Sequence, residues 1–323
     1  MREIRRVTTE LNFNDRLGAV KVRCGIGRKN YRVPPGLYAV GEPSGSSPVF
    51  VSANYKLTFD SLRKELTGVD CYLLILDTKG VNVWCAAGKG TFGTDELIKR
   101  IEMTGLADVV THRRLILPQL GAPGVSAHTV ERRTGFEVVY GPVRASDIKA
   151  FLAAGMEATE DMRKVKFTTR DRAVLIPVEF AMSLRISVMV LALFFLANLI
   201  ASEPFGISDI TAYMGAVLMG TAAVPLLLPV IPGRAFSLKG WVLGACWAAC
   251  AVWVFGWYQD DVVTASGYLF LLPAVSAYFA MNFTGSSTFT SFSGVLREMR
   301  IAVPAVIASV IIGTLLLIVG RVI

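Results

Sequence analysis

The hydrophobic and polar positions divide the chain into two parts with different patterns. Up to about residue 172, short runs of β-branched and aliphatic residues alternate with amphipathic stretches, which is typical of strands and helices that alternate around a parallel sheet. The predicted strands are 49–53, 71–77, 115–117 and 136–140, and the predicted helices are 57–67, 94–104, 125–134 and 145–154. We therefore expect an α/β domain in the first part.

The second part contains five long apolar stretches, near 183–201, 211–231, 240–257, 265–281 and 301–319. Each is close to the roughly 20 residues that cross the hydrocarbon core of a bilayer as a helix. The pattern therefore predicts an all-α membrane domain of five transmembrane helices. Its bounds are 183–323, and a basic, amphipathic linker at 166–182 joins it to a soluble domain at 1–165.

Composition and charge agree with this division. Of the 323 residues, 53% are hydrophobic and 18% are charged, compared with roughly 25% charged residues in an ordinary soluble domain. Residues 1–172 contain 27 Lys and Arg and 19 Asp and Glu, a net charge of +8, whereas residues 173–323 contain six of each. These values exclude a single soluble fold and a disordered chain. Five cysteines without a C-x-x-C spacing exclude a disulfide scaffold and a thiolate metal knuckle.

Charges between the apolar stretches predict the orientation of the chain in the membrane. Lys and Arg precede the first stretch and lie before the third and fifth, whereas Asp and Glu lie in the other two connections. Because short cytoplasmic loops are rich in Lys and Arg, we expect a cytoplasmic N-terminal domain at the inner membrane and a C-terminus outside. Only Arg321 disagrees. The first residues are charged with no apolar segment behind them, so no secretory signal is expected.

Loops after the predicted strands are the candidate ligand sites, because ligands of such sheets bind at the carboxyl ends of strands. Residues 88–93, Gly-Lys-Gly-Thr-Phe-Gly, match the dinucleotide pattern G-x-G-x-x-G. The segment 82–87 separates them from the strand that ends near Asp77, which is too long for a tight phosphate-binding turn. A Walker A loop is also excluded, because Gly rather than Ser or Thr follows Lys89.

The separating segment has chemistry of its own. Asn82 is expected to cap a short helix whose first turn carries Trp84 and Cys85. The following residues, 86–88, have almost no side chain, so a broad, flat ligand could approach the backbone closely. From the residues alone, Cys85 is either a small core residue or a thiol held against such a ligand.

Residues 82–89, Asn-Val-Trp-Cys-Ala-Ala-Gly-Lys, resemble the cap-helix motif of the mercury-methylation corrinoid proteins, the HgcA family. Residues 28–39, 47–60, 117–125 and 135–145 resemble the wider superfamily of the corrinoid iron-sulfur protein large subunit, or CdhD-like proteins. The five-span tail resembles that of the mercury family. The resemblance implies a Rossmann-like, corrinoid-binding α/β domain.

Carried over to this chain, the resemblance implies that Cys85 ligates the cobalt of a cobalamin whose own base is displaced. The implied cap helix against the corrinoid comprises Asn82, Val83, Trp84, Cys85, Ala86, Ala87, Gly88 and Lys89. Further candidate contacts are Ser52 and Thr58, from the segment that contacts corrinoid in relatives, and Gln119, Gly121, Gly124, Gly141 and Pro142, from strand-end loops.

The implied function is a corrinoid-dependent methyltransferase that transfers methyl to an Hg(II)-thiol complex and forms methylmercury. The implied partners are HgcB, a ferredoxin-like protein with two [4Fe-4S] clusters, as reductant, and methyltetrahydrofolate or its methyltransferase as methyl donor. The lipid bilayer is a further partner, and no nucleic acid is expected. Two alternatives stay open. One is a membrane-anchored methyl carrier of one-carbon metabolism like that of the acetyl-CoA pathway, and the other is a non-catalytic corrinoid-binding or sensing module.

Overall fold

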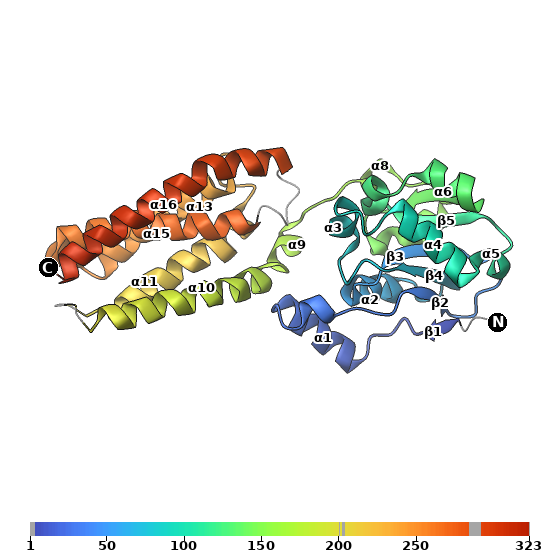
Figure 1. The fold of residues 1–323 in the computed structure, drawn as a ribbon, viewed down its shortest axis with the longest axis horizontal. Coiled ribbons are helices and arrows are strands. Elements are labelled where there is room, and N and C mark those ends of the chain that lie inside the picture. The colour runs from blue at the N-terminus through green and yellow to red at the C-terminus, as the bar shows by residue number, and fades with distance from the viewer. Residues whose placement is uncertain (1–3, 200, 202–203, 284–291, 323) are drawn as a thin grey trace. The chain divides into compact units, whose positions relative to one another are not determined.

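The computed structural model describes residues 4–199, 201, 204–283 and 292–322. The chain divides into two compact units, shown in Figure 1. The α/β unit contains the residues up to Val22 and Ile26–Lys166, and the helical unit contains Arg23–Gly25 and the residues from Phe167 onward. The predicted loop residue Glu203 lies outside the described residues.

The α/β unit has six described strands and eight described α-helices. The strands are β1 (Arg5–Val7), β2 (Gly36–Val40), β3 (Val49–Ala53), β4 (Cys71–Leu76), β5 (Arg114–Pro118) and β6 (Glu137–Gly141). The helices are α1 (Phe13–Arg23), α2 (Lys56–Glu65), α3 (Val83–Gly88), α4 (Thr94–Thr104), α5 (Leu106–Val109), α6 (Ala127–Thr134), α7 (Ile148–Ala153) and α8 (Glu160–Arg163). The four predicted strands and four predicted helices are confirmed, whereas the sequence pattern does not predict β1, β2 or α1.

The strands form one mixed sheet in the order β1-β2-β4-β3-β5-β6. The predicted all-parallel sheet is wrong at one place, because β2 pairs antiparallel with β4. The other neighbours, including β3 with β4 and β5 with β6, are parallel. The sequence pattern predicts no strand or helix in the segments before and after β2. It therefore gives no indication that β2 runs antiparallel to β4.

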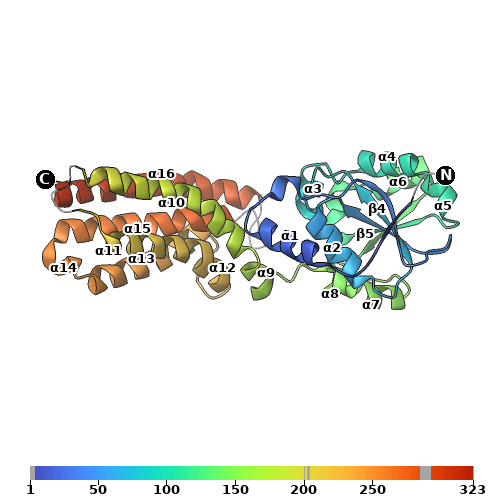
Figure 2. The same ribbon diagram turned by 90° about the horizontal axis from the view of Figure 1, so that it is seen from below.

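The sheet is covered on both faces. Figure 2 shows α4 and α6 on one side of the strands and α2 and α7 on the other. Alternate residues of the central strands enter opposite cores, with Val51 and Leu74 in the core under α4 and with Phe50 and Leu73 in the core under α2. Strands buried on both faces read as continuous apolar runs, which explains why β3 and β4 are readily predicted.

The connections leave neighbouring strands toward opposite faces. From β3 the chain enters α2 on one face, whereas from β5 it continues to α6 on the other. Because β3 and β5 are adjacent in the sheet, a crevice opens between their carboxyl ends. The topology therefore assigns the ligand-binding edge to the loops after β3, β5 and β6.

A buried ionic network fastens α1 to α2. Lys56 Nζ donates to Asp15 Oδ1 at 2.6 Å and to Asp60 Oδ2 at 2.8 Å. The guanidinium of Arg63 donates to Asp15 Oδ2 at 2.7 Å, to Asp60 Oδ1 at 2.8 Å, and to two backbone carbonyls before α1. Burying one of these charges alone is costly, whereas the paired and hydrogen-bonded set is tolerated. The network therefore fixes the place of α1.

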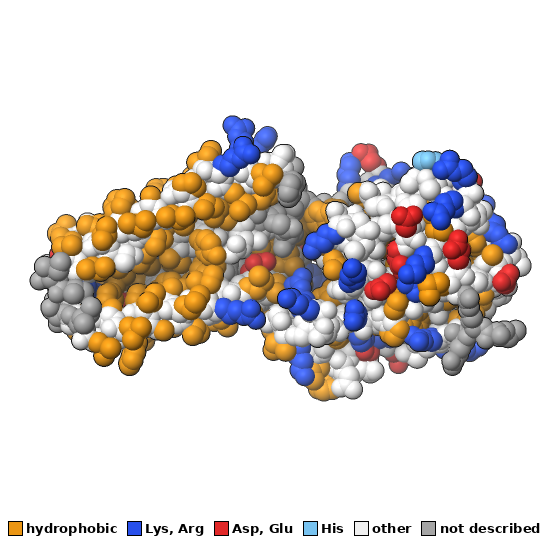
Figure 3. Space-filling view, viewed as in Figure 1, with side chains coloured by type: hydrophobic (Ala, Val, Ile, Leu, Met, Phe, Trp, Pro, Cys, Tyr) orange, Lys and Arg blue, Asp and Glu red, His pale blue; other side chains and the backbone are white. Residues whose placement is uncertain are grey.

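The helical unit contains five helices, among the described residues, that are long and apolar enough to cross a membrane. They span Thr169–Ala197, Ile207–Leu227, Phe236–Val254, Val262–Asn282 and Ser293–Arg321. The corresponding elements are α9 and α10 (Thr169–Ala173, Ile176–Ala197), α11 and α12 (Ile207–Leu218, Val224–Leu227), α13 (Phe236–Val254), α15 (Val262–Asn282) and α16 (Phe292–Val322), and α14 (Trp257–Asp260) is short. Figure 3 shows hydrophobic side chains over much of this unit and charged side chains over the α/β unit. The predicted five stretches are confirmed.

Small residues let two of these helices approach closely. A Cβ atom at Gly240 would lie 2.7 Å from the Ser276 carbonyl oxygen, and one at Gly244 would lie 2.7 Å from Pro273 Cα. Ala248, on the same face of α13, is fully buried. This small-residue face of α13 therefore packs against α15, as such faces commonly do in membrane helices.

Arg321 and Asp209 form a buried ion pair in the helical unit. Arg321 Nη2 donates to Asp209 Oδ1 at 3.0 Å, and the Tyr268 hydroxyl donates to the same oxygen. The predicted stretch 211–231 leaves Asp209 in a connection, but the structure places it in the first turn of α11. Arg321, which disagrees with the predicted orientation, has its charge balanced inside the protein.

We expect Asp15→Asn to lower the free energy of unfolding of the α/β unit by about 3 kcal/mol, because it leaves the Lys56 and Arg63 cations short of a carboxylate. Hydrogen exchange of the β3 and β4 amides in the full chain measures this. The exposed pair of Arg6 and Glu42 supplies the control, since Glu42→Gln should leave exchange unchanged. Equal exchange in Asp15→Asn and wild type would contradict the importance of the network.

The same carboxyl gives a pH dependence. Burial acts to raise the pKa of Asp15, but hydrogen bonds from Lys56, the Asn12 backbone and Arg63 outweigh it and hold the pKa below its ordinary 3.8. Because the folded-state pKa is the lower one, the stabilisation is fully present above pH 3.8 and is lost as the pH falls through the folded-state value. Acid unfolding of Asp15→Asn should lack this component.

Candidate functional site

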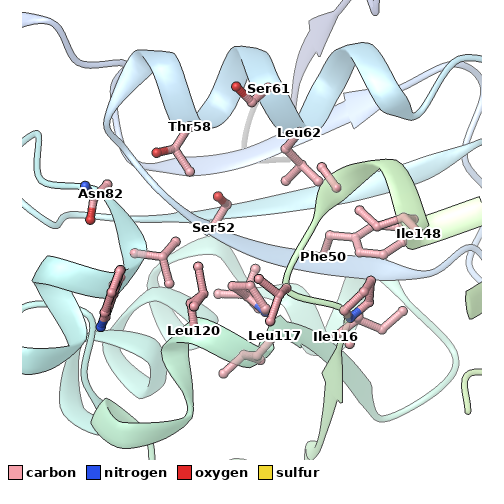
Figure 4. A pocket seen from close by; sticks show the side chains of 18 of the residues that line it. Phe50, Ser52, Thr58, Ser61, Leu62, Asn82, Ile116, Leu117, Leu120 and Ile148 are labelled. Atoms are coloured by element: carbon pink, nitrogen blue, oxygen red, sulfur yellow. The ribbon is translucent and has the colours of Figure 1, made fainter. Parts of the chain in front are cut away.

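A cavity of about 380 Å³ opens at the carboxyl ends of β3, β5 and β6. Figure 4 shows it from close by. Its lining comes from the ends of these strands, from α2, from the start of α3 and from the segment before α7. The lining residues are Phe50, Val51, Ser52, Tyr55, Leu57, Thr58, Ser61, Leu62, Asn82, Val83, Trp84, Ile116, Leu117, Pro118, Leu120, Gly141, Pro142, Val143, Ala145 and Ile148.

The cavity is apolar with hydroxyl groups on one side. In Figure 4, Thr58 and Ser61 extend from α2 and Ser52 from β3, opposite Leu117 and Leu120. Among the described residues, none of these three hydroxyls has a hydrogen-bond partner in the protein. Because polar groups near an apolar surface generally find a partner, the three hydroxyls are available to a ligand that carries amides or other polar groups at its edge.

The cavity wall also contains residues that the sequence analysis did not select, among them Ser61 and Leu62. Ser61 and Leu62 follow Thr58 by three and four residues and therefore share its face of α2. The helical spacing supplied this signal once Thr58 had been chosen. Ile148 was also missed, and it enters the cavity only because α7 packs beside α2.

The residue before α3 caps this short helix as predicted. Asn82 Oδ1 accepts a hydrogen bond from the Cys85 backbone N–H at 2.9 Å. Asn82, Val83 and Trp84 line the cavity, and Trp84 is 40% exposed. The first turn of α3 thus forms one wall of the cavity.

Cys85 is exposed and follows these three wall residues, but it does not itself line the cavity. The core reading of this cysteine is therefore wrong. Ala86 and Ala87 are buried in the core on the α4 face of the sheet, so they do not present a free surface to a ligand. Gly88 does, since a Cβ atom built there meets nothing within 4 Å. Lys89 is exposed at the end of α3.

The segment after β5 packs tightly under α3. It forms a 3-10 turn, η2 (Gln119–Gly124). A Cβ atom at Gly124 would overlap the Phe92 carbonyl oxygen and lie 3.0 Å from Ala87 Cα, and one at Gly121 would lie 3.1 Å from Phe92 Cδ1. These two glycines therefore serve packing. Gln119 carries a buried Oε1 atom without a hydrogen-bond partner in the described residues.

Gly141 and Pro142 line the cavity where β6 ends. Of the predicted contacts, the structure therefore brings together Ser52, Thr58, Asn82, Val83, Trp84, Gly141 and Pro142. It leaves the predicted Gln119, Gly121 and Gly124 beneath α3 rather than on the cavity wall.

The other cysteine of the sheet has different chemistry. Burial, with a smaller contribution from Asp70, raises the pKa of the Cys71 thiol to about 12. This thiol therefore stays protonated and is a core side chain. Among the described residues, no three His, Cys, Asp or Glu side chains lie close enough together to hold a metal ion.

Comparison with known proteins gives matches within the α/β unit. Residues 25–152 match the family model of the CO dehydrogenase/acetyl-CoA synthase delta subunit, CdhD. The chain is 39% identical over 127 residues to the acetyl-CoA decarbonylase/synthase complex subunit gamma of Methanocaldococcus jannaschii, which covers 39% of this chain and 26% of that protein. It is 35% identical over 127 residues to the corrinoid/iron-sulfur protein large subunit of Moorella thermoacetica, covering 39% and 28% respectively.

The matches support the predicted resemblance to the corrinoid iron-sulfur superfamily. The family-model match covers residues 25–152 of this chain. The chain spans about a quarter of the length of these relatives. The narrower resemblance to mercury-methylation proteins receives no support from the matched names. The family-model match ends at residue 152, before the first of the five membrane-capable helices begins at Thr169.

The two glycines around α3 give a matched pair of variants. Gly124→Ala should lower the free energy of unfolding by about 1–3 kcal/mol, because its Cβ overlaps backbone atoms that cannot move independently. Gly88→Ala should leave stability unchanged or slightly raise it, because its Cβ enters open space. Hydrogen exchange of the β5 amides in the full chain measures both. Equal destabilisation would show that the packing of η2 under α3 is described incorrectly.

Proposed function

We propose that the α/β unit binds a corrinoid and acts as a methyl carrier in one-carbon metabolism, attached to a membrane by the helical unit. The observation that carries the proposal is the apolar cavity with three unpaired hydroxyls at the switch between β3 and β5. The similarity of residues 25–152 to proteins whose names contain corrinoid or acetyl-CoA synthase supports the cofactor class.

The residues of the cavity fit part of a corrinoid in their chemistry. A corrin ring is broad and apolar, and amide side chains surround its edge. Leu117, Leu120 and Trp84 supply apolar and aromatic surface, whereas Ser52 and Thr58 supply hydroxyls that can bond amides. Gly88 has no side chain, and a Cβ atom built there meets nothing within 4 Å, so the surface next to the cavity is open to a broad ligand.

When bound, the corrinoid would supply a cobalt atom able to carry a methyl group. The protein's part is to hold and orient that group. Thr58, Ser61 and Ser52 would fix one edge through hydrogen bonds, and the first turn of α3, held by the Asn82 cap, would lie at another. The apolar wall would exclude water from the methyl group.

Partner proteins must supply the reducing electrons, in this proposal. No cluster of metal-binding side chains is found in the described part of the chain, and iron-sulfur clusters need closely spaced cysteine ligands. A ferredoxin-like protein such as HgcB, with two [4Fe-4S] clusters, is the proposed electron donor. Methyltetrahydrofolate, directly or through its methyltransferase, is the proposed methyl donor.

A second candidate function is methyl transfer to an Hg(II)-thiol complex, which forms methylmercury. The observation that favours it is the exposed thiol of Cys85 next to the three wall residues of α3. We propose that this thiol ligates cobalt when the cofactor's own base is displaced. A thiolate is a strong electron donor to a metal, so the Cys85 thiolate would supply electron density that favours release of methyl to a soft acceptor. The named relatives support the carrier function better.

The five membrane-capable helices support a membrane location. We propose that the α/β unit faces the cytoplasm at the inner membrane and that the chain ends outside. The predicted orientation depends on the Lys and Arg residues that lie before the first, third and fifth apolar stretches. The one residue that contradicts it, Arg321, is neutralised by Asp209, so the other basic residues determine the charge balance of the connections.

Thr58→Val tests the hydroxyl side of the cavity. The substitution keeps the shape and removes one hydrogen bond, so we expect roughly fivefold weaker cobalamin binding. Absorbance titration of the full chain in detergent with base-off cobalamin measures it. Thr67→Val is the control, because Thr67 lies beyond α2 and donates to the Lys64 carbonyl away from the cavity. Unchanged affinity in Thr58→Val would remove Thr58 from the site.

Cys85→Ala separates the two candidate functions. The full chain, loaded with a methylated corrinoid, is mixed either with an Hg(II)-thiol complex or with a CO dehydrogenase/acetyl-CoA synthase. The amounts of methylmercury and of methyl group transferred to the synthase are then measured. If the chain methylates mercury through a thiolate-ligated cobalt, Cys85→Ala abolishes methylmercury and changes the visible spectrum. If it is a one-carbon carrier, both forms transfer methyl to the synthase and neither yields methylmercury.

A further inference from the structure

Helix α1 has two faces with different surroundings. Asp15 and Val22 are buried, and a Cβ atom at Gly18, between them, would overlap the Tyr31 ring. The ion pairs of Asp15 with Lys56 and Arg63 fix the rotation of the helix. The opposite face of α1 is therefore exposed to solvent, because the buried contacts fix the rotation of the helix.

That outward face is apolar. Phe13 is 76% exposed, Leu17 38% and Val20 56%. Their spacing of four and three residues places them in one stripe along the helix. Single exposed apolar side chains are ordinary, but an ordered stripe marks an interaction surface. Ile26, also exposed, lies three residues after the end of the helix.

Basic side chains lie on both sides of this stripe. At 100° per residue, Lys21 falls on one flank and Arg16 and Arg23 fall on the other. All three are exposed, and none forms an ion pair with a carboxylate among the described residues. The single acidic residue of α1, Asp15, is on the buried face. The outward face therefore combines apolar residues with uncompensated positive charge.

We propose that α1 is an interfacial helix that binds the surface of a bilayer rich in anionic lipids. Phe13, Leu17 and Val20 enter the region between headgroups and acyl chains, while Arg16, Lys21 and Arg23 contact lipid phosphates. An apolar stripe with basic flanks is the arrangement that such helices use. A leaflet meets both flanks at once, whereas a protein partner would need acidic groups on both sides of an apolar groove.

The membrane proposal also agrees with the rest of the chain. The five membrane-capable helices follow the α/β unit after a short connection, so a bilayer is available to α1 without a second protein. Through Asp15, the helix is fastened to Lys56 and Arg63 of α2, which carries Thr58 and Ser61 of the cavity. Lipid binding by α1 would thus hold the cavity at a fixed orientation to the membrane surface. This last step rests on the proposed function, whereas lipid binding does not.

Photo-crosslinking in the full chain tests the proposal. The residue p-benzoylphenylalanine replaces Leu17, and the protein is reconstituted in vesicles of phosphatidylcholine and phosphatidylglycerol. After irradiation, mass spectrometry should find the α1 peptide with the added mass of one phospholipid. The same replacement at Met103, an exposed apolar residue of α4, is the positional control and should give no lipid adduct.

Charge variants test the anionic part of the claim. Each basic residue near an anionic surface is worth about fivefold in binding. The triple variant Arg16→Gln, Lys21→Gln and Arg23→Gln should therefore lower the lipid adduct by at least about tenfold. The matched variant Lys99→Gln, Arg132→Gln and Lys149→Gln removes three exposed charges elsewhere and should not lower it. Wild type in vesicles of phosphatidylcholine alone should behave like the first variant.

Three results would overturn the proposal: no adduct at position 17, an adduct to protein instead of lipid, or equal yields in the two triple variants. Cobalamin binding of each triple variant is measured in parallel by absorbance. A variant that loses lipid adducts and keeps cobalamin affinity separates this surface from the cavity. If wild type does not bind cobalamin, the corrinoid proposal is refuted, and the lipid-binding result is unaffected.

Discussion

The fold depends on burial of the central strands on both faces. Alternate residues of β3 and β4 enter two different cores, so helices must cover both sides of the sheet. Because the chain leaves β3 for one face and β5 for the other, no connection covers the carboxyl ends of these adjacent strands. The cavity is thus a result of the topology, and its side chains only determine what it binds.

The polar groups of the cavity belong to segments that other contacts hold rigid. Thr58 and Ser61 lie on α2, which the ionic network with Asp15 fixes from the other side. The first turn of α3 is held by the Asn82 cap, and the end of α3 is held by close packing of Ala87 against Gly124 of η2. A site built on such supports needs little rearrangement when a ligand binds, which favours affinity.

The sequence predicts the parts of the fold that have a strong local pattern. The bounds of β3 and α4 are predicted to the residue, since a doubly buried strand gives a short continuous apolar run and an amphipathic helix gives a helical period. The three-residue β1 and the antiparallel β2 depend on pairing with distant strands, which no local pattern records. Ser52, Thr58 and the Asn82 cap could be predicted near the site, but the exposure of Cys85 and the burial of Ala86 follow only from how α3 packs.

The ion pair between Asp209 and Arg321 has a consequence for how the helical unit is assembled. The two residues lie 112 positions apart, in the second and the last of the membrane-capable helices. During synthesis, the Asp209 carboxylate therefore cannot pair with Arg321 until α16 has been made. Until then its partner from the earlier helices is the Tyr268 hydroxyl of α15, which carries no charge. Neutralisation of this buried carboxylate is therefore a late step in the assembly of the helical unit.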